Sequence, residues 1–578
     1  GSTTEFYMSP EGYKSIKSER IDLNPINLLI GANGSGKSNF ISFFDFLNRL
    51  YNKTLNEYIA LTGGENKILH KGQKVTDRIS FKVEFENGNN GYSANLKLGS
   101  DGLIFTEERL IYRSDKGVNI SRSDREARIK TTDNYRAKYV IRYLEGFRKY
   151  HFHDTSDKSP FTIPSHIEND IYYLYYNGAN LAAFLYNIKE EEKIVYNRIV
   201  KTIQSIAPYF SDFYFIPNTE DFVKLQWKDK YSDTVYGVND LSDGTIRFIA
   251  LTVLFMQPNL PDTIIIDEPE LGLHPSAISK LAGMIKSVSA KGSQVIIATQ
   301  STDLISHFSP ESIITVDQID GCSKFNRLDA DKLQEWLEDY TIDDLWKRSI
   351  ITTGQPNYWK MKRVIIICEG ETEKEFCNTI LIPYFAKKEI YIQSPLIKKS
   401  MGGIVKWSEL QKQITLHLKN DSSAIVTTLI DYYGLYRKYN FPMWDNAERN
   451  PNKNERMEIL EQGMFESIED SLRYRFIPYL QLHEFEGLLF NDIDIFYEQI
   501  PPKELVGIDE LTQTFQQYSN PEMINNNRET SPSHRLERII LGYNKIVYGN
   551  ILAEAIGLDK IKAKSPRFNE WIKKLEKI

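Results

Sequence analysis

The sequence predicts an α/β protein built from two domains, and three observations support this fold class. A glycine-rich loop follows the apolar segment 26–30 and precedes a helical pattern. Far downstream, a second apolar segment ends in the acidic pair Asp267 and Glu268. Beyond residue 361, two further apolar segments each end in a carboxylate. Because parallel strands present functional residues at their carboxyl ends, each half of the chain predicts a parallel sheet with its own site.

Length and composition are those of a globular protein. The 578 residues exceed what one hydrophobic core usually serves, and 41% hydrophobic with 26% charged residues is ordinary for folded domains. No membrane span or signal peptide is visible, and Cys322, Cys368 and Cys377 lack metal or disulfide spacing, so we expect a cytoplasmic protein without a membrane partner. The net charge of −7 excludes a uniformly basic nucleic-acid binder but not a local basic channel.

The glycine-rich loop at residues 31–38 fits the pattern G-x-x-x-x-G-K-S between a strand and a helix. In that setting, successive backbone N–H groups and the helix N-terminus cradle phosphates. The Lys37 ammonium would reach the β- and γ-phosphates, and the Ser38 hydroxyl would bind Mg²⁺. A glycine-rich turn without a ligand is the alternative. The predicted ATP-binding residues of the loop are Asn33, Gly34, Ser35, Gly36, Lys37, Ser38 and Asn39.

The apolar segment 263–267 is expected to be a central strand that ends beside the nucleotide. There Asp267 would hold Mg²⁺ and Glu268 would orient or deprotonate the attacking water. Ahead of it, Leu-Ser-Asp-Gly-Thr at 241–245 opens a helix, which a simple helix cap would also explain. After it, a further strand runs into Gln300, which can hydrogen-bond the γ-phosphate region but cannot carry a proton, so we expect slow, gated hydrolysis.

Taken in order, these segments resemble ABC-type ATPases. The loop variant Asn-Gly-Ser-Gly-Lys-Ser-Asn at 33–39 and the block Asp-Glu-Pro-Glu-x-x-Leu-His-Pro at 267–275 resemble the SMC, Rad50 and OLD-family group. The family signature is Leu-Ser-Gly-Gly-Gln, from which Asp243 and Thr245 depart, and the family often has His where this chain has Gln300. The resemblance implies that Ser242 and Gly244 of one subunit cap the γ-phosphate held by another. It therefore implies a homodimer or higher homo-oligomer that ATP closes and hydrolysis releases.

The ATPase domain is expected to span 1–345, with a helical insertion at about 101–218 that is rich in Tyr, Arg and Lys. We interpret this insertion as an arm for dimerisation or partner contact, with a solvated charged helix pair as the alternative. The segment 79–85 is expected to extend the core sheet, and Gln73 is a candidate for a water-sensing glutamine. Residues 346–361 would be a linker to a second domain at 362–578.

Carboxylates follow the apolar segments of this second domain. Strand-like residues 364–368 lead into Glu369 and Glu373, and residues 424–430 lead into Asp431. Such hard oxygen ligands favour Mg²⁺ or Mn²⁺. In the apolar run 479–490, ionisable groups are costly to bury unless they bind something. We expect the two glutamates of this run to point one way on a strand, so that one completes the metal site while the histidine acts as acid or base; a structural cluster is the alternative. The candidates in this run are His483, Glu484 and Glu486.

The pattern Glu-Gly-x-Thr-Glu at 369–373 resembles the Toprim domain. The resemblance is closer to RloB-like Toprim relatives, through the segments 431–434, 475–486 and 532–536. It implies an α/β nuclease domain. Ordinary Toprim domains carry Asp-x-Asp on the second strand, whereas this chain has Tyr433 after Asp431, which weakens the case for two-metal catalysis.

Basic residues gather late in the chain, where they could bind phosphates or form a solvated face. No base-reading motif is visible. The members of this group are Arg528, His534, Arg535, Arg538, Lys545, Lys560, Lys562, Lys564 and Arg567.

An ABC-type ATPase joined to a Toprim-like domain resembles OLD-family nucleases, which implies an ATP-regulated, Mg²⁺-dependent nuclease acting on DNA or RNA. It further implies a bacterial anti-phage effector of the abortive-infection kind, alone or with a partner such as a retron reverse transcriptase and its RNA–DNA product. The alternative is a non-catalytic, ATP-gated assembly or sensor protein whose second domain only binds nucleic acid or a partner. Neither the substrate nor the trigger is visible in the sequence.

Overall fold

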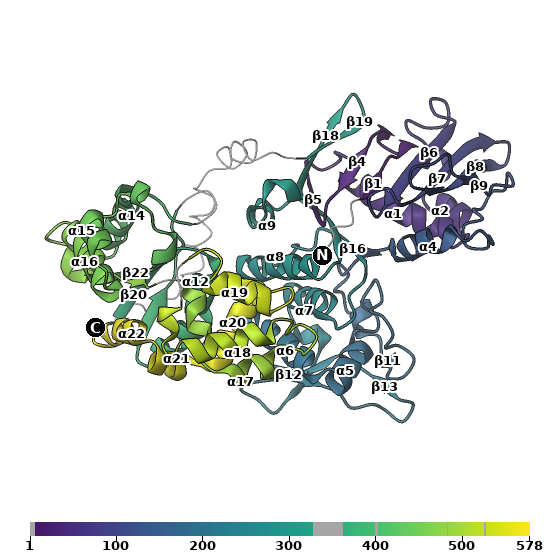
Figure 1. Ribbon diagram of the computed structural model, residues 1–578. Coiled ribbons are helices and arrows are strands. Elements are labelled where there is room, and N and C mark those ends of the chain that lie inside the picture. Colours follow the sequence, from purple (N-terminus) through teal and green to yellow (C-terminus); the bar gives the residue numbers. More distant parts are fainter. Residues whose placement is uncertain (1–5, 328–361, 399–402, 483, 525–526) are drawn as a thin grey trace. The chain divides into compact units, whose positions relative to one another are not determined.

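The computed structural model describes residues 6–327, 362–398, 403–482, 484–524 and 527–578 (Figure 1). The chain forms two compact units, Gly1–Leu333 and Gln334–Ile578. The predicted linker at 346–361 lies outside the described residues, so its bounds stay a prediction.

A six-stranded sheet forms the centre of the N-terminal unit, in the order β10-β16-β17-β5-β18-β19. All neighbours are parallel except the hairpin of β18 and β19. The inner strands are almost wholly apolar and buried, as expected for a parallel sheet covered on both faces. The strands are β5 (Ile26–Ile30), β10 (Lys149–Tyr150), β16 (Thr263–Asp267), β17 (Gln294–Thr299), β18 (Ile313–Ile319) and β19 (Cys322–Arg327).

Three helices follow the strands that carry the predicted nucleotide site. Helix α1 (Lys37–Tyr51) packs against β10, β16 and β17, and its phenylalanines form the aromatic centre of the core. Helix α8 (Pro275–Ala290) packs against β5 and β17, and also against α7 (Asp243–Met256). The short α9 (Thr302–Ser306) follows β17. The predicted alternation of strand and helix around the glycine-rich loop is therefore confirmed.

A second, antiparallel sheet of eight strands lies in the same unit. Residues 79–85 belong to this sheet rather than to the parallel one, which corrects the expectation for this segment. They form β6, which pairs along its length with β7 and whose apolar side chains face α1. The strands are β1 (Phe6–Met8), β2 (Glu11–Tyr13), β3 (Ile16–Ser18), β4 (Ile21–Leu23), β6 (Arg78–Phe85), β7 (Asn90–Gly99), β8 (Gly102–Tyr112) and β9 (Val118–Asn119).

The stretch predicted as a helical insertion, about 101–218, has a mixed structure. It begins with β8, which pairs with β7 in a long hairpin, so this part is strand rather than helix. Later come a helical pair, α5 (Leu181–Glu191) and α6 (Lys193–Ile206), in which α6 packs on α7. The pair is thus anchored by an apolar face and is not solvated on all sides. The smaller elements of the N-terminal unit, inside and outside this stretch, are α2 (Leu55–Leu61), α3 (Glu65–Ile68), α4 (Ala137–Gly146), β11 (Ser165–His166), β12 (Phe210–Tyr214), β13 (Phe222–Val223), β14 (Gln226–Asp229) and β15 (Val235–Gly237).

The C-terminal unit has its own parallel sheet of five strands, ordered β21-β20-β22-β23, with β24 also pairing β22. Helices α14 to α16 and the apolar sides of these strands enclose one core cluster. The strands are β20 (Lys362–Cys368), β21 (Ile390–Gln393), β22 (Ile425–Asp431), β23 (Phe476–Ile477) and β24 (Leu480–Gln481). The helices are α12 (Glu371–Phe376), α13 (Ile382–Ala386), α14 (Trp407–Asn420), α15 (Trp444–Arg449), α16 (Lys453–Glu466), α17 (Ile493–Gln499), α18 (Ile508–Gln517), α19 (Pro532–Ile539), α20 (Asn550–Ile556), α21 (Leu558–Lys564) and α22 (Pro566–Glu576).

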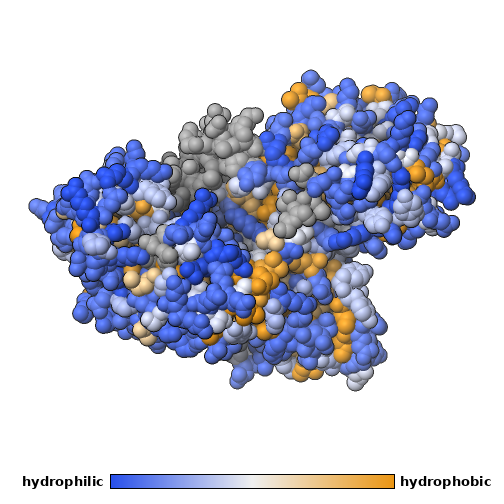
Figure 2. Space-filling model, viewed as in Figure 1, coloured by the Kyte–Doolittle hydropathy of each residue, from blue (hydrophilic) through white to orange (hydrophobic). Residues whose placement is uncertain are grey.

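Hydrophilic residues cover most of the face of the molecule seen in Figure 2, with smaller hydrophobic clusters between them. Within the described ranges, no helix combines the length and the apolar character needed to cross a membrane.

Candidate functional site

The glycine-rich loop joins β5 to α1 and is shaped by its glycines. Gly34 and Gly36 have φ of 80° and 117°, in the left-handed region that favours glycine. A Cβ at Gly36 would lie 1.9 Å from Ser323 Oγ, so a side chain is also excluded by space. Ser35 Oγ is buried and has no partner among the described residues. Because α1 begins at Lys37, its first N–H groups point into the loop, and the loop fits a phosphate ligand.

Lys37 is only 5% exposed. Its ammonium donates to the carbonyl oxygens of Gly31 and Ala32. Desolvation lowers the pKa of Lys37, and the nearby Glu268 and Asp267 partly offset this effect. Phosphate oxygens are stronger acceptors than carbonyls, so a nucleotide would compensate this cation better than the loop does.

Parallel pairing brings the predicted Mg²⁺ ligands together. In register, Asp267 of β16 lies opposite Ala298 of β17, and Thr299 lies opposite Ile30 of β5. The three strand ends therefore meet at one edge of the sheet. There the Ser38 hydroxyl lies 3.4 Å from Asp267 Oδ2. Glu268 comes next, with φ of 49°, a left-handed conformation that is costly for a residue with a Cβ.

Gln300 also lies at this edge. Its side-chain amide donates to Asn33 Oδ1 of the phosphate loop. Its backbone N–H donates to Glu270 Oε1 at 3.2 Å, and the Thr299 hydroxyl donates to the same oxygen at 2.6 Å. Burial raises the pKa of Glu270. Sequence reasoning missed Glu270, although the run Asp-Glu-Pro-Glu after a buried strand was the signal that could have identified it.

The segment at 241–245 caps α7. Ser242 Oγ accepts a hydrogen bond from the Thr245 backbone N–H at 3.2 Å. Within a single chain, Ser242 therefore acts as a simple helix cap. A Cβ at Gly244 would lie 2.3 Å from the Gly272 carbonyl oxygen, so glycine permits the close approach of the segment after Glu268. Ser242 remains exposed. Its action on a second subunit stays a prediction.

Two predicted residues of this unit have other contacts. The Asn39 side-chain amide donates to Ser15 Oγ at 2.8 Å, which ties α1 to the turn between β2 and β3. Gln73 lies in the turn before β6, where its backbone N–H donates to Asn66 Oδ1. None of its described contacts reaches the phosphate loop.

In the C-terminal unit, β20 and β22 are parallel neighbours, with Cys368 opposite Leu429. Glu369 and Asp431 therefore leave the same edge of the sheet, and Glu369 Oε2 accepts the Asp431 backbone N–H at 2.9 Å. A Cβ at Gly434 would lie 3.3 Å from Glu369 Oε1, so glycine keeps this approach open. The structure thus brings together the two predicted metal ligands that the sequence separates by some sixty positions.

Like charges are concentrated at this edge. Desolvation and then Glu373 raise the pKa of Glu369 to about 7. Desolvation raises the pKa of Glu373, and desolvation with Glu373 raises that of Asp431 well above its ordinary value. Glu486 contributes to all three effects. We call Glu369, Glu373, Asp431 and Glu486 the carboxylate pocket.

Lys545 faces the carboxylate pocket. Desolvation acts to lower its pKa, but the four carboxylates outweigh that effect, so the pKa is raised. Lys545 is exposed to solvent, although enough protein lies around its ammonium to desolvate it in part. Lys545 was predicted only as one of several phosphate-binding residues, because its position beside the carboxylates depends on the distant helical turn Lys545–Gly549.

Two features of the carboxylate pocket suit a bound cation: its negative charge, and one carboxylate oxygen that lacks a hydrogen-bond partner in the described part of the chain. Asp431 Oδ1 is shielded from solvent and has no hydrogen-bond partner among the described residues. Repelling carboxylates are relieved by a bound cation, which would favour their charged forms. However, among the described residues no three or more His, Cys, Asp or Glu side chains converge in the way that a metal ion requires. Glu373 Oε2 instead accepts from the Gly370 backbone N–H at 3.0 Å, at the start of its own helix.

The glutamates at 484 and 486 do not lie on a strand, which corrects the expectation that they point one way. Strand β24 ends at Gln481, and a 3-10 helix spans Phe485–Leu489, so the alternation of a strand is lost. Glu484 instead accepts from the backbone N–H and hydroxyl of Ser533, at 2.8 and 3.0 Å. Desolvation and Glu486 raise the pKa of Glu484 to about 7. His483 lies outside the described residues.

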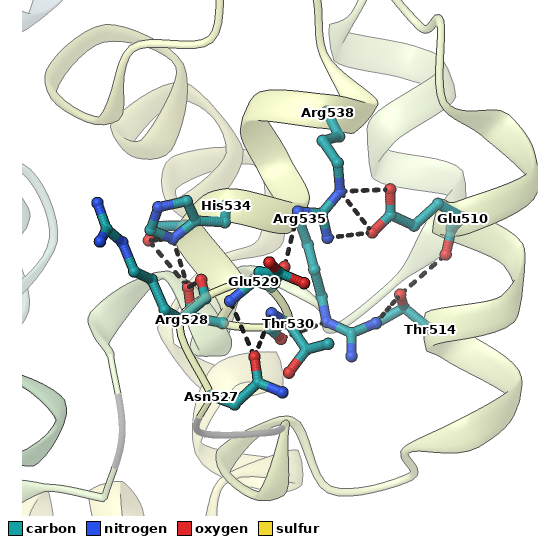
Figure 3. Close-up of polar contacts among 11 residues, drawn as sticks. Glu510, Thr514, Asn527, Arg528, Glu529, Thr530, His534, Arg535 and Arg538 are labelled. Atoms are coloured by element: carbon teal, nitrogen blue, oxygen red, sulfur yellow. Dashed lines mark hydrogen bonds and ion pairs between the residues drawn. The ribbon is translucent and has the colours of Figure 1, made fainter.

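Most of the late basic residues are engaged within the chain. Figure 3 shows Arg535 directed to Thr514, and Arg538 paired with Glu510. His534 Nδ1 lies 2.7 Å from Ser531 Oγ. Arg528 points away from these contacts (Figure 3) and is exposed. Further pairs or hydrogen bonds hold Lys560 to Asp492, Lys562 to Glu576, Lys564 to Asn491 and Arg567 to Glu461.

Comparison with known families gives two matches. Residues 26–306 match the family described as "AAA domain, putative AbiEii toxin, Type IV TA system". Residues 368–576 match the family described as "Domain of unknown function (DUF4276)". The first match covers the phosphate loop, the acidic pair and Gln300.

Individual relatives are distant. The Old nuclease of Escherichia phage P2 is 31% identical over 110 residues, which is 19% of this chain and 18% of that protein. A solved Smc head bound to the C-winged helix domain of ScpA is 17% identical, with a TM-score of 0.39, covering 57% of this chain and 98% of that chain. The SMC head domain from Thermotoga maritima is 14% identical, with a TM-score of 0.33, covering 57% of this chain and 100% of that chain.

The family match and the loop geometry agree. The N-terminal unit carries an ATPase domain of the kind that the glycine-rich loop predicts, and the chain is related at a distance to an OLD-type nuclease. The Toprim resemblance of the C-terminal unit stays a prediction, since its family match is to a different description.

Proposed function

We propose that the chain is an ATP-regulated, divalent-metal-dependent nuclease that acts on DNA or RNA in defence against phage. The observation that carries the proposal is the carboxylate pocket with Lys545 at the carboxyl edge of a second parallel sheet. Perturbed carboxylates of this kind cluster at functional sites. The distant likeness to a phage nuclease and the AbiEii-toxin description of the ATPase family support a role in conflict between phage and host.

In the ATPase half, Lys37 and the loop N–H groups would hold the triphosphate, while Ser38 and Asp267 would hold its Mg²⁺. Glu268 would orient the attacking water. Gln300 contacts the loop through Asn33 and would bond the γ-phosphate region without carrying a proton, so turnover would be slow. Ser242 and Gly244 would complete the site of a second copy, so ATP would close a homodimer and hydrolysis would open it.

In the nuclease half, Glu369, Asp431 and Glu486 would hold the cation, either Mg²⁺ or Mn²⁺, with Glu373 turning from its helix to join them. A divalent cation bound there would supply charge stabilisation to the phosphate that is attacked. Lys545 would neutralise the same phosphate from the protein side. His483 is proposed as acid or base from the sequence alone. Arg528 is exposed and could contact the nucleic-acid backbone.

A second candidate function is a non-catalytic, ATP-gated assembly or sensor protein. Two observations favour it. The second carboxylate of an ordinary Toprim strand is Tyr433 in this chain, and no metal-ready group of three carboxylates exists among the described residues. In that case the C-terminal unit would bind nucleic acid, or a partner such as a retron reverse transcriptase with its RNA–DNA product, without cleaving it.

Cleavage assays separate the two functions. The chain would be incubated with labelled DNA and with tRNA, in Mg²⁺ or Mn²⁺, with and without ATP. We expect Glu369→Gln and Asp431→Asn each to abolish cleavage while ATP hydrolysis stays near that of the unmodified chain, because the two sites belong to separate units. Glu409→Gln, on the exposed face of α14, is the matched control. If the unmodified chain binds but cleaves nothing under any of these conditions, the assembly function is the correct one.

A further inference from the structure

The loop 151–154 follows β10 at the nucleotide edge of the parallel sheet. In β10, Lys149 and Tyr150 lie opposite Ile265 and Ile266 of β16. The chain leaving β10 therefore runs beside the acidic pair that ends β16. His153 Nε2 lies 2.8 Å from the Asp267 carbonyl oxygen. Because a carbonyl oxygen can only accept, Nε2 must carry the hydrogen and donate it.

The carbonyl that His153 holds belongs to the peptide joining Asp267 to Glu268. The other side of the same peptide is also held, because the Glu268 N–H donates to the Ala298 carbonyl oxygen at 2.7 Å. The peptide is thus clamped on one side by the loop after β10 and on the other by β17. It leads directly into the left-handed φ of 49° at Glu268, a conformation that persists only where the surroundings impose it.

Arg247 connects this clamp to helix α7. Its Nη2 donates to the His153 carbonyl oxygen at 2.8 Å, and its Nη1 lies 3.5 Å from the Leu271 carbonyl oxygen. A cavity of about 10 Å³ is lined by His153, Arg247, Asp267 and Glu268 among others, which is close to the space that one water molecule needs. α7 is the helix that Ser242 caps.

We propose that His153 is a positioning residue for ATP hydrolysis. Its Nε2–H holds the peptide between Asp267 and Glu268 and so fixes the direction of the Glu268 side chain. Arg247 couples this clamp to α7, so a displacement of α7 changes the position of Glu268. The proposal rests on the ATPase half of the proposed function and is independent of the nuclease half.

Steady-state ATP hydrolysis and binding of a fluorescent ATP analogue test the proposal on the full chain. His153→Phe keeps a ring but loses the donor, and we expect kcat to fall about tenfold, equivalent to ~1.4 kcal/mol in the barrier, with KM and nucleotide affinity changed by less than about twofold. His153→Gln keeps an N–H donor and should recover most of the rate. His151→Phe alters the exposed neighbour on the same loop and should hydrolyse ATP normally.

Variants of Arg247 make the outcome decisive. Arg247→Ala should lower kcat. If both residues act through the same peptide, the variant that combines His153→Phe with Arg247→Ala should have a kcat no lower than that of the more damaging single substitution. A normal rate in His153→Phe, or failure of His153→Gln to recover while still binding ATP, would each overturn the role. Circular dichroism checks folding, and His153→Ala replaces His153→Phe if the larger ring disrupts the unit.

Discussion

Charged side chains in low-dielectric surroundings distinguish both sites at the scale of single residues. Lys37 is nearly inaccessible and depends on Glu268 and Asp267 to offset its desolvation. The carboxylate pocket has the opposite balance, since its four acids all interact with the ammonium of Lys545. An excess of buried like charge costs folding free energy unless protons or cations neutralise it. The pocket should therefore respond to pH and to metal.

Stability should fall as the pH rises through the range in which Glu369 ionises. Its pKa of about 7 in the folded chain lies above the ordinary 4.5, so its contribution to stability is complete below about pH 4.5 and is lost as the pH rises through about 7. In EDTA, we expect the unfolding midpoint to drop by on the order of 5 °C over this range because of the pocket. The drop in unfolding midpoint should be smaller in Glu369→Gln than in the unmodified chain, and the same as in the unmodified chain in Glu409→Gln.

Added Mg²⁺ should raise the midpoint mainly above about pH 7, where the carboxylates are ionised and can bind it. Differential scanning calorimetry at several pH values measures both effects. A pH profile in Glu369→Gln identical to that of the unmodified chain would show that the pocket does not hold the uncompensated charge described here.

At the scale of elements, the positions where strands end decide what the chain can do. β5, β16 and β17 deliver the phosphate loop, the acidic pair and Gln300 to one edge, and β20 and β22 do the same for Glu369 and Asp431. The turn from β5 into α1 leaves no room for a side chain at Gly36, which combines a left-handed φ with close contact to Ser323.

A comparison of two glycines in this turn tests that account. Gly36→Ala should destabilise the ATPase domain strongly, because it adds a collision to the conformational cost of about 1–2 kcal/mol for a left-handed residue. Gly34→Ala pays a similar conformational cost but has open space around its Cβ, so it should be milder. Thermal unfolding of both variants measures the difference. If the two variants were destabilised equally, the Ser323 side chain would be able to move away from the new Cβ at no cost.

On the scale of the whole molecule, the chain combines an ATPase unit and a carboxylate-bearing unit, each with its own parallel sheet. The sheets differ in what their edges can bind: one presents N–H groups and Lys37 to an anion, and the other presents carboxylates to a cation. An exposed Ser242 at the start of α7 is available to a second copy of the chain. Regulation of one unit by the other would then act through assembly.

Glu268→Gln should trap an ATP-dependent dimer or larger assembly. The substitution keeps the Asp267 carboxylate, proposed to hold Mg²⁺, and removes the carboxylate proposed to orient water, so ATP would bind without being hydrolysed. Sedimentation velocity with and without ATP measures the assembly. Lys37→Ala is the matched control, since it loses the phosphate-binding ammonium and should stay unassembled. A monomer in both conditions for Glu268→Gln would contradict the action of Ser242 and Gly244 in trans.

The sequence by itself determined the local features of both units. The strands at 26–30, 263–267, 294–299, 362–368 and 425–431 lie where apolar runs predicted them, within one or two residues. The phosphate loop, the acidic pair and the carboxylates after the later strands were predicted by the same local patterns. Such features could be found without a structure because a strand, a turn and a helix start depend on neighbouring residues.

Only the tertiary structure decided which distant residues join these sites. It assigned residues 79–85 to the antiparallel sheet, turned Glu484 toward Ser533, and paired most late basic residues with acids or carbonyls. It also placed Lys545 at the carboxylate pocket and His153 at the Asp267 carbonyl. His153 lies 114 positions from its partner. Contacts of this range depend on sheet register and helix packing, which no local pattern of side chains records.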